Sequence, residues 1–136
     1  FARSPTPFSL ILIDVDKFKF INDTYGHLVG DHVLQTMAAL TREKTRQSDI
    51  LCRWGGEEFI ILAPNCALDD ANRLAENIRK SIMESRFVLK NPSQQITISA
   101  GVAEIMENEV ADQIVGRADK ALYAAKQNGR NRVENA

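Results

Sequence analysis

The segment that most limits the possible folds of this chain is a glycine pair between two apolar runs. The heptapeptide RWGGEEF (53–59) has ILC on one side and IILA on the other. Two apolar runs joined through glycines predict a β-hairpin, with its arms at 50–54 and 58–63. A turn needs only the glycines, so the two acids that follow them, Glu57 and Glu58, require another explanation.

Two further apolar segments predict strands before and after this hairpin. Residues 8–13 (FSLILI) form a continuous apolar run, which is typical of a buried strand. Residues 95–105 (QITISAGVAEI) alternate in the way that is typical of a half-buried strand. Residues 14–30 mix charged, aromatic and polar side chains and read as a short helical turn that leads into a loop.

Apolar residues recur at helical spacing in three segments. The first begins near Asp31, whose carboxylate is placed to cap the helix start. The second opens at Asp69 and Asp70, and the third covers about 110–128, with Gly129 where a C-terminal glycine is favoured. The predicted order along the chain is therefore strand, helix, hairpin, helix, strand, helix.

This order predicts an α+β fold, a sandwich of a mainly antiparallel sheet with helices packed on one face. The closest general plan is the ferredoxin-like split βαβ arrangement. At 136 residues, the chain is expected to form a single domain over 1–136.

Charge and cysteine content narrow the choice of partners. The chain has 17 basic and 18 acidic residues and a net charge of −1, so no overall field favours nucleic acid or an anionic membrane. The two cysteines, Cys52 and Cys66, match neither a disulfide framework nor a zinc pattern, and we expect both to be reduced and half-buried. Reduced thiols indicate the cytoplasm, which leaves open a membrane attachment of a parent protein.

Acidic residues follow the first predicted strand and the glycine pair. Asp14 and Asp16 come at the end of that strand, and Glu57 and Glu58 lie at the hairpin tip. If the hairpin pairs beside the first strand, three or four carboxylates meet at one edge of the sheet, where a cation would neutralise them. Oxygen ligands favour Mg²⁺ or Mn²⁺. The alternative is that these acids are ordinary solvated charges.

A second group of polar residues can be interpreted either as a ligand-binding site or as ordinary residues of helix ends and loops. Lys126 and Arg130 are four residues apart and share a face if the last helix continues through that turn, but they also suit the helix dipole. Asn22 and Asp31 supply the amide and carboxylate that match the edge of guanine, although such residues are common in loops.

Read together, these segments resemble the GGDEF domain of diguanylate cyclases, in the form whose motif reads GGEEF. Besides RWGGEEF, the similar stretches are LIDVDKFKFINDTYGHLVGD, RQSD, TISAGVAE and ADKALYAAKQNGRNRV, in the order of the family and over essentially the whole chain. The resemblance implies a fold like the polymerase palm. It also implies condensation of two GTP molecules into cyclic di-GMP and two pyrophosphates, in a homodimer with one GTP bound to each protomer.

The resemblance also assigns metal and catalytic roles. Asp14, the backbone carbonyl of Val15 and Glu57 become metal ligands for Mg²⁺ or Mn²⁺, with two ions expected in each active site. Glu58 becomes an additional acid at the metal, and its division of labour with Glu57 stays open. Glu57 is also the candidate that helps to deprotonate the attacking hydroxyl, so both glutamates are counted as catalytic.

GTP contacts are implied for residues in four segments of the chain. Asn22 and Asp31 match the residues that read guanine, and Lys126 and Arg130 match the pair that clamps the terminal phosphates. The full set of implied GTP-binding residues is Phe18, Lys19, Asn22, Asp31, Gly55, Gly56, Lys126 and Arg130.

The resemblance finally implies regulation and context. Arg46 and Asp49, in RQSD, fit an RxxD inhibitory site for cyclic di-GMP, which Arg73 or Arg79 would complete in trans, from a second copy of the chain. Family members normally begin with a DxLTxLxNR-like segment and follow an upstream sensory or receiver domain, whereas this sequence starts at FARSPTP. The alternative function is a non-catalytic receptor module for GTP or cyclic di-GMP.

Overall fold

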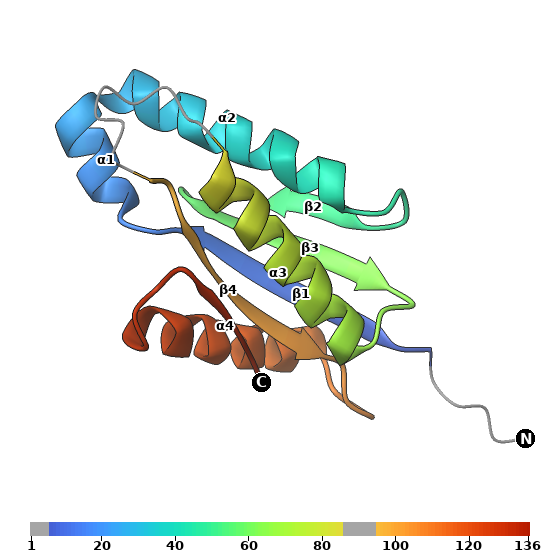
Figure 1. The fold of residues 1–136 in the computed structure, drawn as a ribbon. Helices are drawn as coiled ribbons and strands as arrows, with labels where there is room; N and C mark the ends of the chain where they lie inside the picture. The colour runs from blue at the N-terminus through green and yellow to red at the C-terminus, as the bar shows by residue number, and fades with distance from the viewer. Residues whose placement is uncertain (1–5, 86–94) are drawn as a thin grey trace, which may run out of the picture.

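A single five-stranded sheet forms the centre of the molecule (Figure 1). The computed structural model describes residues 6–85 and 95–136. In chain order the elements are β1 (Phe8–Val15), α1 (Phe18–Tyr25), α2 (His27–Lys44), β2 (Ile50–Arg53), β3 (Glu58–Pro64), α3 (Leu68–Glu84), β4 (Ile98–Glu104), α4 (Ala111–Gln127) and β5 (Arg132–Asn135).

The sheet has the strand order β2-β3-β1-β4-β5, with β1 in the middle. β1 pairs antiparallel with both β3 and β4, and β2 and β3 form the predicted hairpin. The first four strands follow the ferredoxin-like plan, so the predicted α+β fold is confirmed. β5 runs parallel to β4 and adds an edge strand that the sequence did not predict, because RVEN is short and polar.

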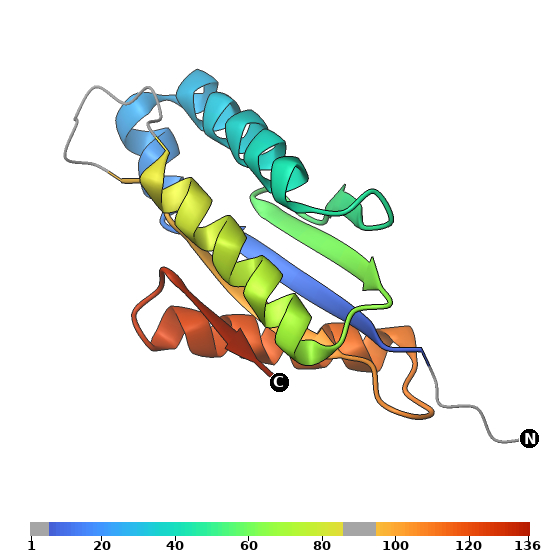
Figure 2. The ribbon, with the colours of Figure 1, turned by 45° about the vertical axis from the view of Figure 1, so that its right-hand side comes forward.

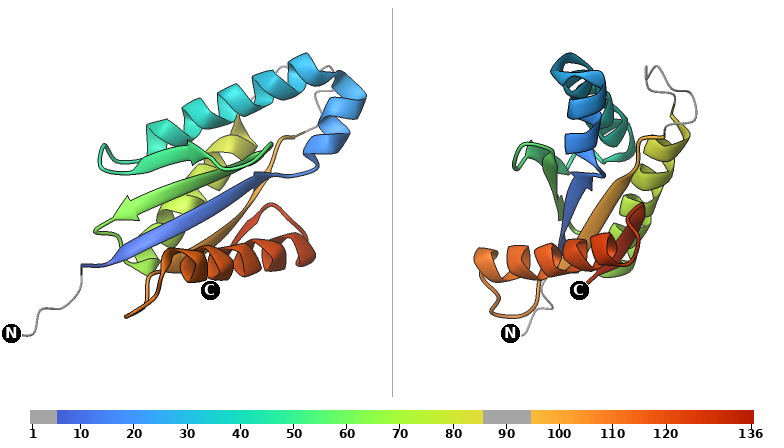
Figure 3. Two further views of the ribbon diagram at one scale, coloured as in Figure 1. Left: turned by 180° about the vertical axis from the view of Figure 1, so that it is seen from behind. Right: turned by 90° about the vertical axis from the view of Figure 1, so that its left-hand side faces the viewer.

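Helices cover both faces of the sheet, so the expectation of a single covered face was wrong (Figures 2 and 3). Alternate residues of β1 separate into two apolar clusters. Ile11 and Ile13 pack with residues of α2 and α3. Leu10 and Leu12 pack on the other face with residues of α4 such as Leu122. A strand buried on both faces reads as a continuous apolar run, which explains FSLILI.

The segment between β1 and α2 is more helical than the sequence indicated. α1 occupies 18–25, and Gly26, at a φ of 95°, separates it from α2. α2 begins at His27, so Asp31 lies inside the helix and does not cap it, contrary to the prediction. Gly26 carries the positive φ that breaks the helix, a conformation that glycine tolerates best.

The end of α4 also differs from one expectation. Gly129 adopts a φ of 120°, which confirms a glycine-favoring position after the helix. The helix ends at Gln127, so Lys126 and Arg130 do not share a helix face. Arg130 lies beyond the glycine, at a φ of 63°.

Both cysteines are free, but only one is buried. Cys66 packs in the larger core, whereas Cys52 lies exposed on β2, so the expectation of two half-buried thiols was wrong. Within residues 6–85 and 95–136, no helix combines the length and apolar character that crossing a membrane requires.

Candidate active site

The pairing of β1 with β3 brings the acids of two distant segments to one end of the sheet. Asp14 stands opposite Glu58 in the register, and the backbone N–H of Val15 donates to the carbonyl of Glu57 at 3.3 Å. The predicted meeting of Asp14 with the hairpin acids is therefore confirmed. Asp16 is not part of it, because its carboxylate bonds to the side of β4.

Asp14 is a buried carboxylate whose charge is only partly compensated. It is 5% exposed, and within the described residues its Oδ1 has no hydrogen-bond partner. Burial raises the pKa of Asp14 to about 6; Lys126 opposes this rise, and the charges of Glu57 and Glu58 add to it. The two glutamates are thus close enough to disfavour the ionisation of Asp14.

Lys126 reaches this acidic end of the sheet from α4. Its ammonium group donates to Oδ2 of Asp14. Burial acts to lower the pKa of Lys126, but the bond to Asp14 and the charges of Glu58 and Glu57 leave that pKa above its usual value. Lys126 therefore serves as the counter-ion of Asp14, while Arg130 lies in an exposed turn.

The described part of the chain holds no ready-made cluster of three or more His, Cys, Asp or Glu side chains around a possible metal position. The residues nevertheless fit a hard cation. Asp14 offers an unpartnered buried oxygen, and Glu57 and Glu58 contribute further oxygens nearby. Oxygen donors of this kind are those that Mg²⁺ and Mn²⁺ prefer.

The hairpin tip leaves its backbone open. Neither Gly55 nor Gly56 has a positive φ, so the turn itself does not demand glycine. A Cβ at Gly56 would have open space around it, and one at Gly55 would meet only the side chain of Glu58. Glycine at positions 55 and 56 therefore leaves the backbone of the hairpin tip accessible.

Arg53 is a residue of this region that the sequence did not single out. Its Nε donates to the carbonyls of Gly56 at 3.0 Å and Gly55 at 3.3 Å, and so ties the tip to β2. An arginine before two glycines is a weak signal, because most such side chains are solvated.

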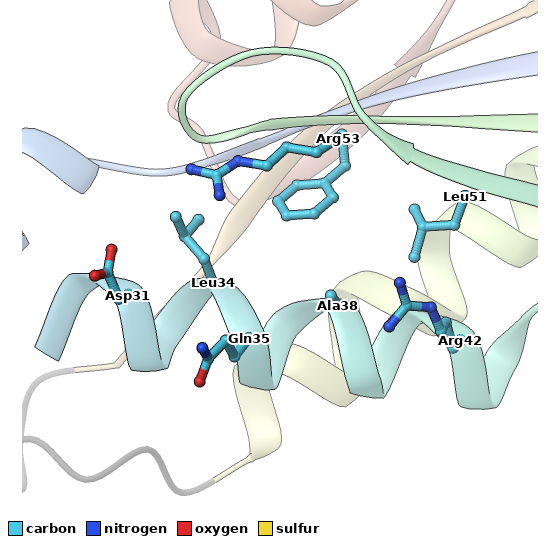
Figure 4. Close-up of a pocket in the computed structure, with 8 residues that line it drawn as sticks. Asp31, Leu34, Gln35, Ala38, Arg42, Leu51 and Arg53 are labelled. Carbon is cyan, nitrogen blue, oxygen red and sulfur yellow. The ribbon is translucent and has the colours of Figure 1, made fainter. Parts of the chain in front are cut away.

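A pocket of about 570 Å³ lies between α2 and the hairpin. Asp31 enters it from α2 and Arg53 from β2, on opposite walls (Figure 4). Apolar side chains such as Leu34 and Phe59 form its floor. An apolar lining flanked by a carboxylate and a guanidinium suits an aromatic base.

Asn22 of α1 packs closely against Gly30 of α2. A Cβ built on Gly30 of α2 would lie 1.8 Å from Oδ1 of Asn22 and 3.2 Å from the ring of Phe18. Only glycine at position 30, one residue before Asp31, leaves room for the Asn22 amide. Phe18 and Lys19 form the first turn of α1, where backbone N–H groups are free to meet an anion.

Another pocket, of about 270 Å³, is lined by Arg46 of the predicted inhibitory motif. Arg46 donates to Asp49 at 2.8 Å and to the carbonyl of Pro64 at 2.6 Å. Arg73 lines the same pocket. Arg79 instead bonds to Asn131 at 2.9 Å, so of the two candidates only Arg73 shares the pocket with Arg46.

The fold and this site define a class of protein: a ferredoxin-like α+β domain with carboxylates gathered at the end of its central strand. Residues 1–132 match the family model described as diguanylate cyclase, GGDEF domain. The chain therefore belongs to the GGDEF domain family.

Named relatives agree with this assignment. Diguanylate cyclase A of Treponema denticola is 48% identical over 126 residues, which cover 92% of this chain and 34% of that protein. The response regulator PleD of Caulobacter vibrioides is 44% identical over 130 residues, covering 93% of this chain and 29% of PleD. The chain thus spans about a third or less of these relatives.

Solved structures of the family share the fold. The active GGEEF domain of a diguanylate cyclase from Vibrio cholerae superposes with a TM-score of 0.89 at 42% identity, covering 96% of this chain and 83% of that one. The GGDEF domain of DgcB from Caulobacter crescentus, in complex with c-di-GMP, has a TM-score of 0.89 at 35% identity, covering 96% of this chain and 78% of that one.

Proposed function

We propose that this chain is the catalytic domain of a diguanylate cyclase, which condenses two GTP molecules into cyclic di-GMP and releases two pyrophosphates. The observation that carries the proposal is the buried carboxylate of Asp14. It faces the hairpin acids across the β1–β3 pair and keeps one oxygen without a partner. In a GGDEF domain, such an acidic strand end supports nucleotidyl transfer on a metal-bound nucleotide.

The metal-binding residues proposed are Asp14, Glu57 and the carbonyl of Val15, with Glu58 as an additional acid. Two ions of Mg²⁺ or Mn²⁺, when bound, supply electrostatic stabilisation to the transferred phosphate. Lys126 now neutralises Asp14, and a cation at Asp14 would release its ammonium group for the terminal phosphates of GTP.

The remaining GTP contacts follow the geometry of the two helices after β1. Asn22 and Asp31 would read the edge of guanine, with the base in the pocket between α2 and the hairpin. Phe18 and Lys19 would meet the phosphates from the first turn of α1. Arg130 would add a second cation, and Gly55 and Gly56 would leave room for the nucleotide at the hairpin tip.

In the proposed reaction, the 3′-oxygen of each GTP attacks the α-phosphorus of the other. One O–P bond forms as the bond from the α-phosphorus to pyrophosphate breaks, and the hydroxyl proton passes to the carboxylate of Glu57. One domain holds one GTP, so two copies must face each other as a homodimer. A sensory or receiver domain upstream in the parent protein would control that approach.

We also propose that cyclic di-GMP inhibits the domain at Arg46 and Asp49. Arg46 is already extended along Asp49 and the neighbouring pocket wall, where Arg73 supplies another cation. Guanidinium groups bind phosphate oxygens in a bidentate manner, which suits the two phosphates of the product. Arg46→Ala should weaken product inhibition and leave the initial rate unchanged. Unchanged inhibition in that variant would remove Arg46 from the inhibitory site.

The function is tested by incubating the chain with GTP and Mg²⁺ and measuring cyclic di-GMP by mass spectrometry, at concentrations where sedimentation shows a dimer. Glu57→Gln should lower the rate by at least about 100-fold. Glu43→Gln, an exposed glutamate on α2, is the matched control and should keep full activity.

Full activity of Glu57→Gln would reject the assignment of Glu57. A dimer that binds GTP but forms no cyclic di-GMP would favour the alternative of a receptor module.

A further inference from the structure

The turn between α4 and β5 is strained, and it carries Arg130. Three successive residues there have positive φ values: Gly129 at 120°, Arg130 at 63° and Asn131 at 48°. Glycine tolerates this region, but two adjacent residues with side chains adopt it rarely. Such backbone persists only where the surroundings hold it in place, and it concentrates at functional sites.

One side of the turn is not packed against the rest of the molecule. A cavity of about 260 Å³ opens beside it, lined by Gly129, Arg130 and Asn131 on one side and by Lys17 and Phe20 on another. On its other side, the turn is held by polar contacts.

Arg79 of α3 donates to Oδ1 of Asn131 at 2.9 Å, and the N–H of Arg130 donates to the carbonyl of Ala125 at 2.9 Å. A further contact ties the backbone of the turn to a carboxylate at the end of β1. Asp16 is 8% exposed. Its Oδ2 accepts from the backbone N–H of Asn131 at 3.0 Å and from Oγ1 of Thr97 at 2.8 Å. Its Oδ1 accepts from Oγ of Ser99 at 2.6 Å. All three donors are neutral, and together they fix the carboxylate between β4 and the turn.

Asp14 and Asp16 therefore have different tasks although they are two residues apart. Asp14 keeps a buried oxygen without a partner beside the hairpin acids. Asp16 has both oxygens engaged, on the opposite side of β1 from the hairpin. Because Asp14 and Asp16 leave the same strand end, the turn with Arg130 is tied directly to the strand that carries the proposed metal ligand.

We propose that Asp16 is a positioning residue, which holds the turn 129–131 so that Arg130 meets the terminal phosphates of GTP. This inference rests on the proposed function, because it takes the phosphate contact of Arg130 from there. Asp16 touches neither nucleotide nor metal and acts only through the N–H of Asn131. Loss of the carboxylate would let the turn relax and move Arg130 away.

The test compares a triphosphate with a monophosphate in calorimetric titrations with Mg²⁺. The probes are α,β-methylene-GTP, which cannot release pyrophosphate, and GMP, which lacks the phosphates assigned to Arg130. Asp16→Asn should weaken binding of the triphosphate analogue about tenfold, as expected when one charge-assisted contact is lost. Its affinity for GMP should be unchanged. Arg130→Ala should give the same pattern, and the double variant should lose no more than Arg130→Ala alone.

Two further variants guard against trivial explanations. Asp119→Asn removes the same charge from the exposed side of α4 and should bind both probes normally. Thr97→Val removes one donor to the same Asp16 oxygen, so it should show a weaker form of the triphosphate defect if Asp16→Asn does not fold. Retained triphosphate affinity in folded Asp16→Asn, or in Thr97→Val where Asp16→Asn does not fold, would overturn the proposal.

Other outcomes separate the two proposals. An equal loss of GMP and triphosphate affinity, or additive losses in the double variant, would overturn the positioning role of Asp16 while Arg130 keeps its phosphate contact. Normal triphosphate binding by Arg130→Ala would instead reject the phosphate role of Arg130, and the role of Asp16 would fail with it.

Discussion

The two ends of the proposed nucleotide site are held in shape by different forces. At the end of β1, opposite charges decide the arrangement: Asp14 is buried, short of one partner and neutralised by Lys126. Between α1 and α2, packing decides it: Asn22 fits against Gly30, where no side chain would leave room. The first end should respond to pH and cations, and the second should respond only to changes of shape.

Removing the charge at the strand end should have the largest effect. Asp14→Asn deletes the proposed metal ligand and frees Lys126, so cyclic di-GMP synthesis should fall by roughly 10²–10³-fold. The affinity for guanosine, measured by calorimetry, should change less than twofold, because the site between α1 and α2 does not depend on Asp14. A comparable loss in both measurements would mean that the two ends are not separate.

The same charge predicts a pH dependence of stability in the metal-free protein. The pKa of Asp14 is about 6 in the folded chain and 3.8 as its ordinary value, so between these values the folded state holds more protons than the unfolded state. The free energy of unfolding should therefore fall as pH rises through this window, by roughly 2 kcal/mol. The stabilisation that the protonated Asp14 carboxyl provides is present in full below about pH 4 and is lost above about pH 6.

Denaturant titrations in EDTA from pH 4 to pH 7 measure this fall. Asp14→Asn should remove this part of the slope, because its amide does not titrate, whereas Asp119→Asn should leave it in place. Added Mg²⁺ should restore stability mainly above pH 6, where Asp14 is ionised. An unchanged slope in Asp14→Asn would show that another group produces it.

The strand end was largely predictable from the sequence, and the helical end was not. The apolar runs around RWGGEEF predicted the hairpin, and its pairing with β1 put Asp14 beside Glu58. Apolar runs bounded by turn residues depend only on the local sequence and so can be read directly. Without the family resemblance, the residue pattern could not separate Asp14 from Asp16, because the burial and partners that distinguish them come from other parts of the chain, such as β4 and the C-terminal turn.

The helical end depends on a contact between two elements, for which the sequence has no periodic signal. A polar stretch with two glycines read as a loop, and Asp31 read as the helix start. In the structure Gly26 breaks the backbone and Gly30 is buried inside α2. The reason for glycine at 30 is the side chain of Asn22, eight residues earlier, and only the packed helices reveal it.

A methyl group at the helical end should therefore act on base recognition. Gly30→Ala would press on the Asn22 amide, which is a side-chain end that can turn away without unfolding the helix pair. We expect KM for GTP to rise about tenfold, with a matching loss of preference for GTP over ITP. Gly116→Ala, where a Cβ meets nothing within 4 Å, is the matched control and should be neutral.

The measurement is the ratio of kcat/KM for GTP and ITP in each variant. A drop in kcat with an unchanged ratio would place Gly30 with the catalytic end and contradict the division. A thermal unfolding scan of Gly30→Ala distinguishes a local displacement of Asn22 from general damage to α1 and α2.

Arg53 connects the two ends, and its replacement should have the smallest effect. Its guanidinium holds the hairpin tip through the carbonyls of Gly55 and Gly56, and its side chain lines the pocket opposite Asp31. These bonds are exposed, and exposed contacts contribute only about 0.5–1 kcal/mol. Arg53→Met should therefore raise KM for GTP about threefold, because both the tip and the pocket wall become looser.

Arg42→Met is the matched control, because Arg42 lines the same pocket without reaching the tip. If Arg53 acts through the hairpin, its effect and that of Asp14 should not be independent. The loss of cyclic di-GMP synthesis in the double variant Arg53→Met, Asp14→Asn should then be smaller than the product of the two single losses. If Arg53 acts through the pocket wall, the smaller-than-multiplicative loss should appear when Arg53→Met is combined with Gly30→Ala instead. A smaller-than-multiplicative loss in both double variants would show that charge and packing at this site are coupled through Arg53. The contrast between the two ends would then be limited.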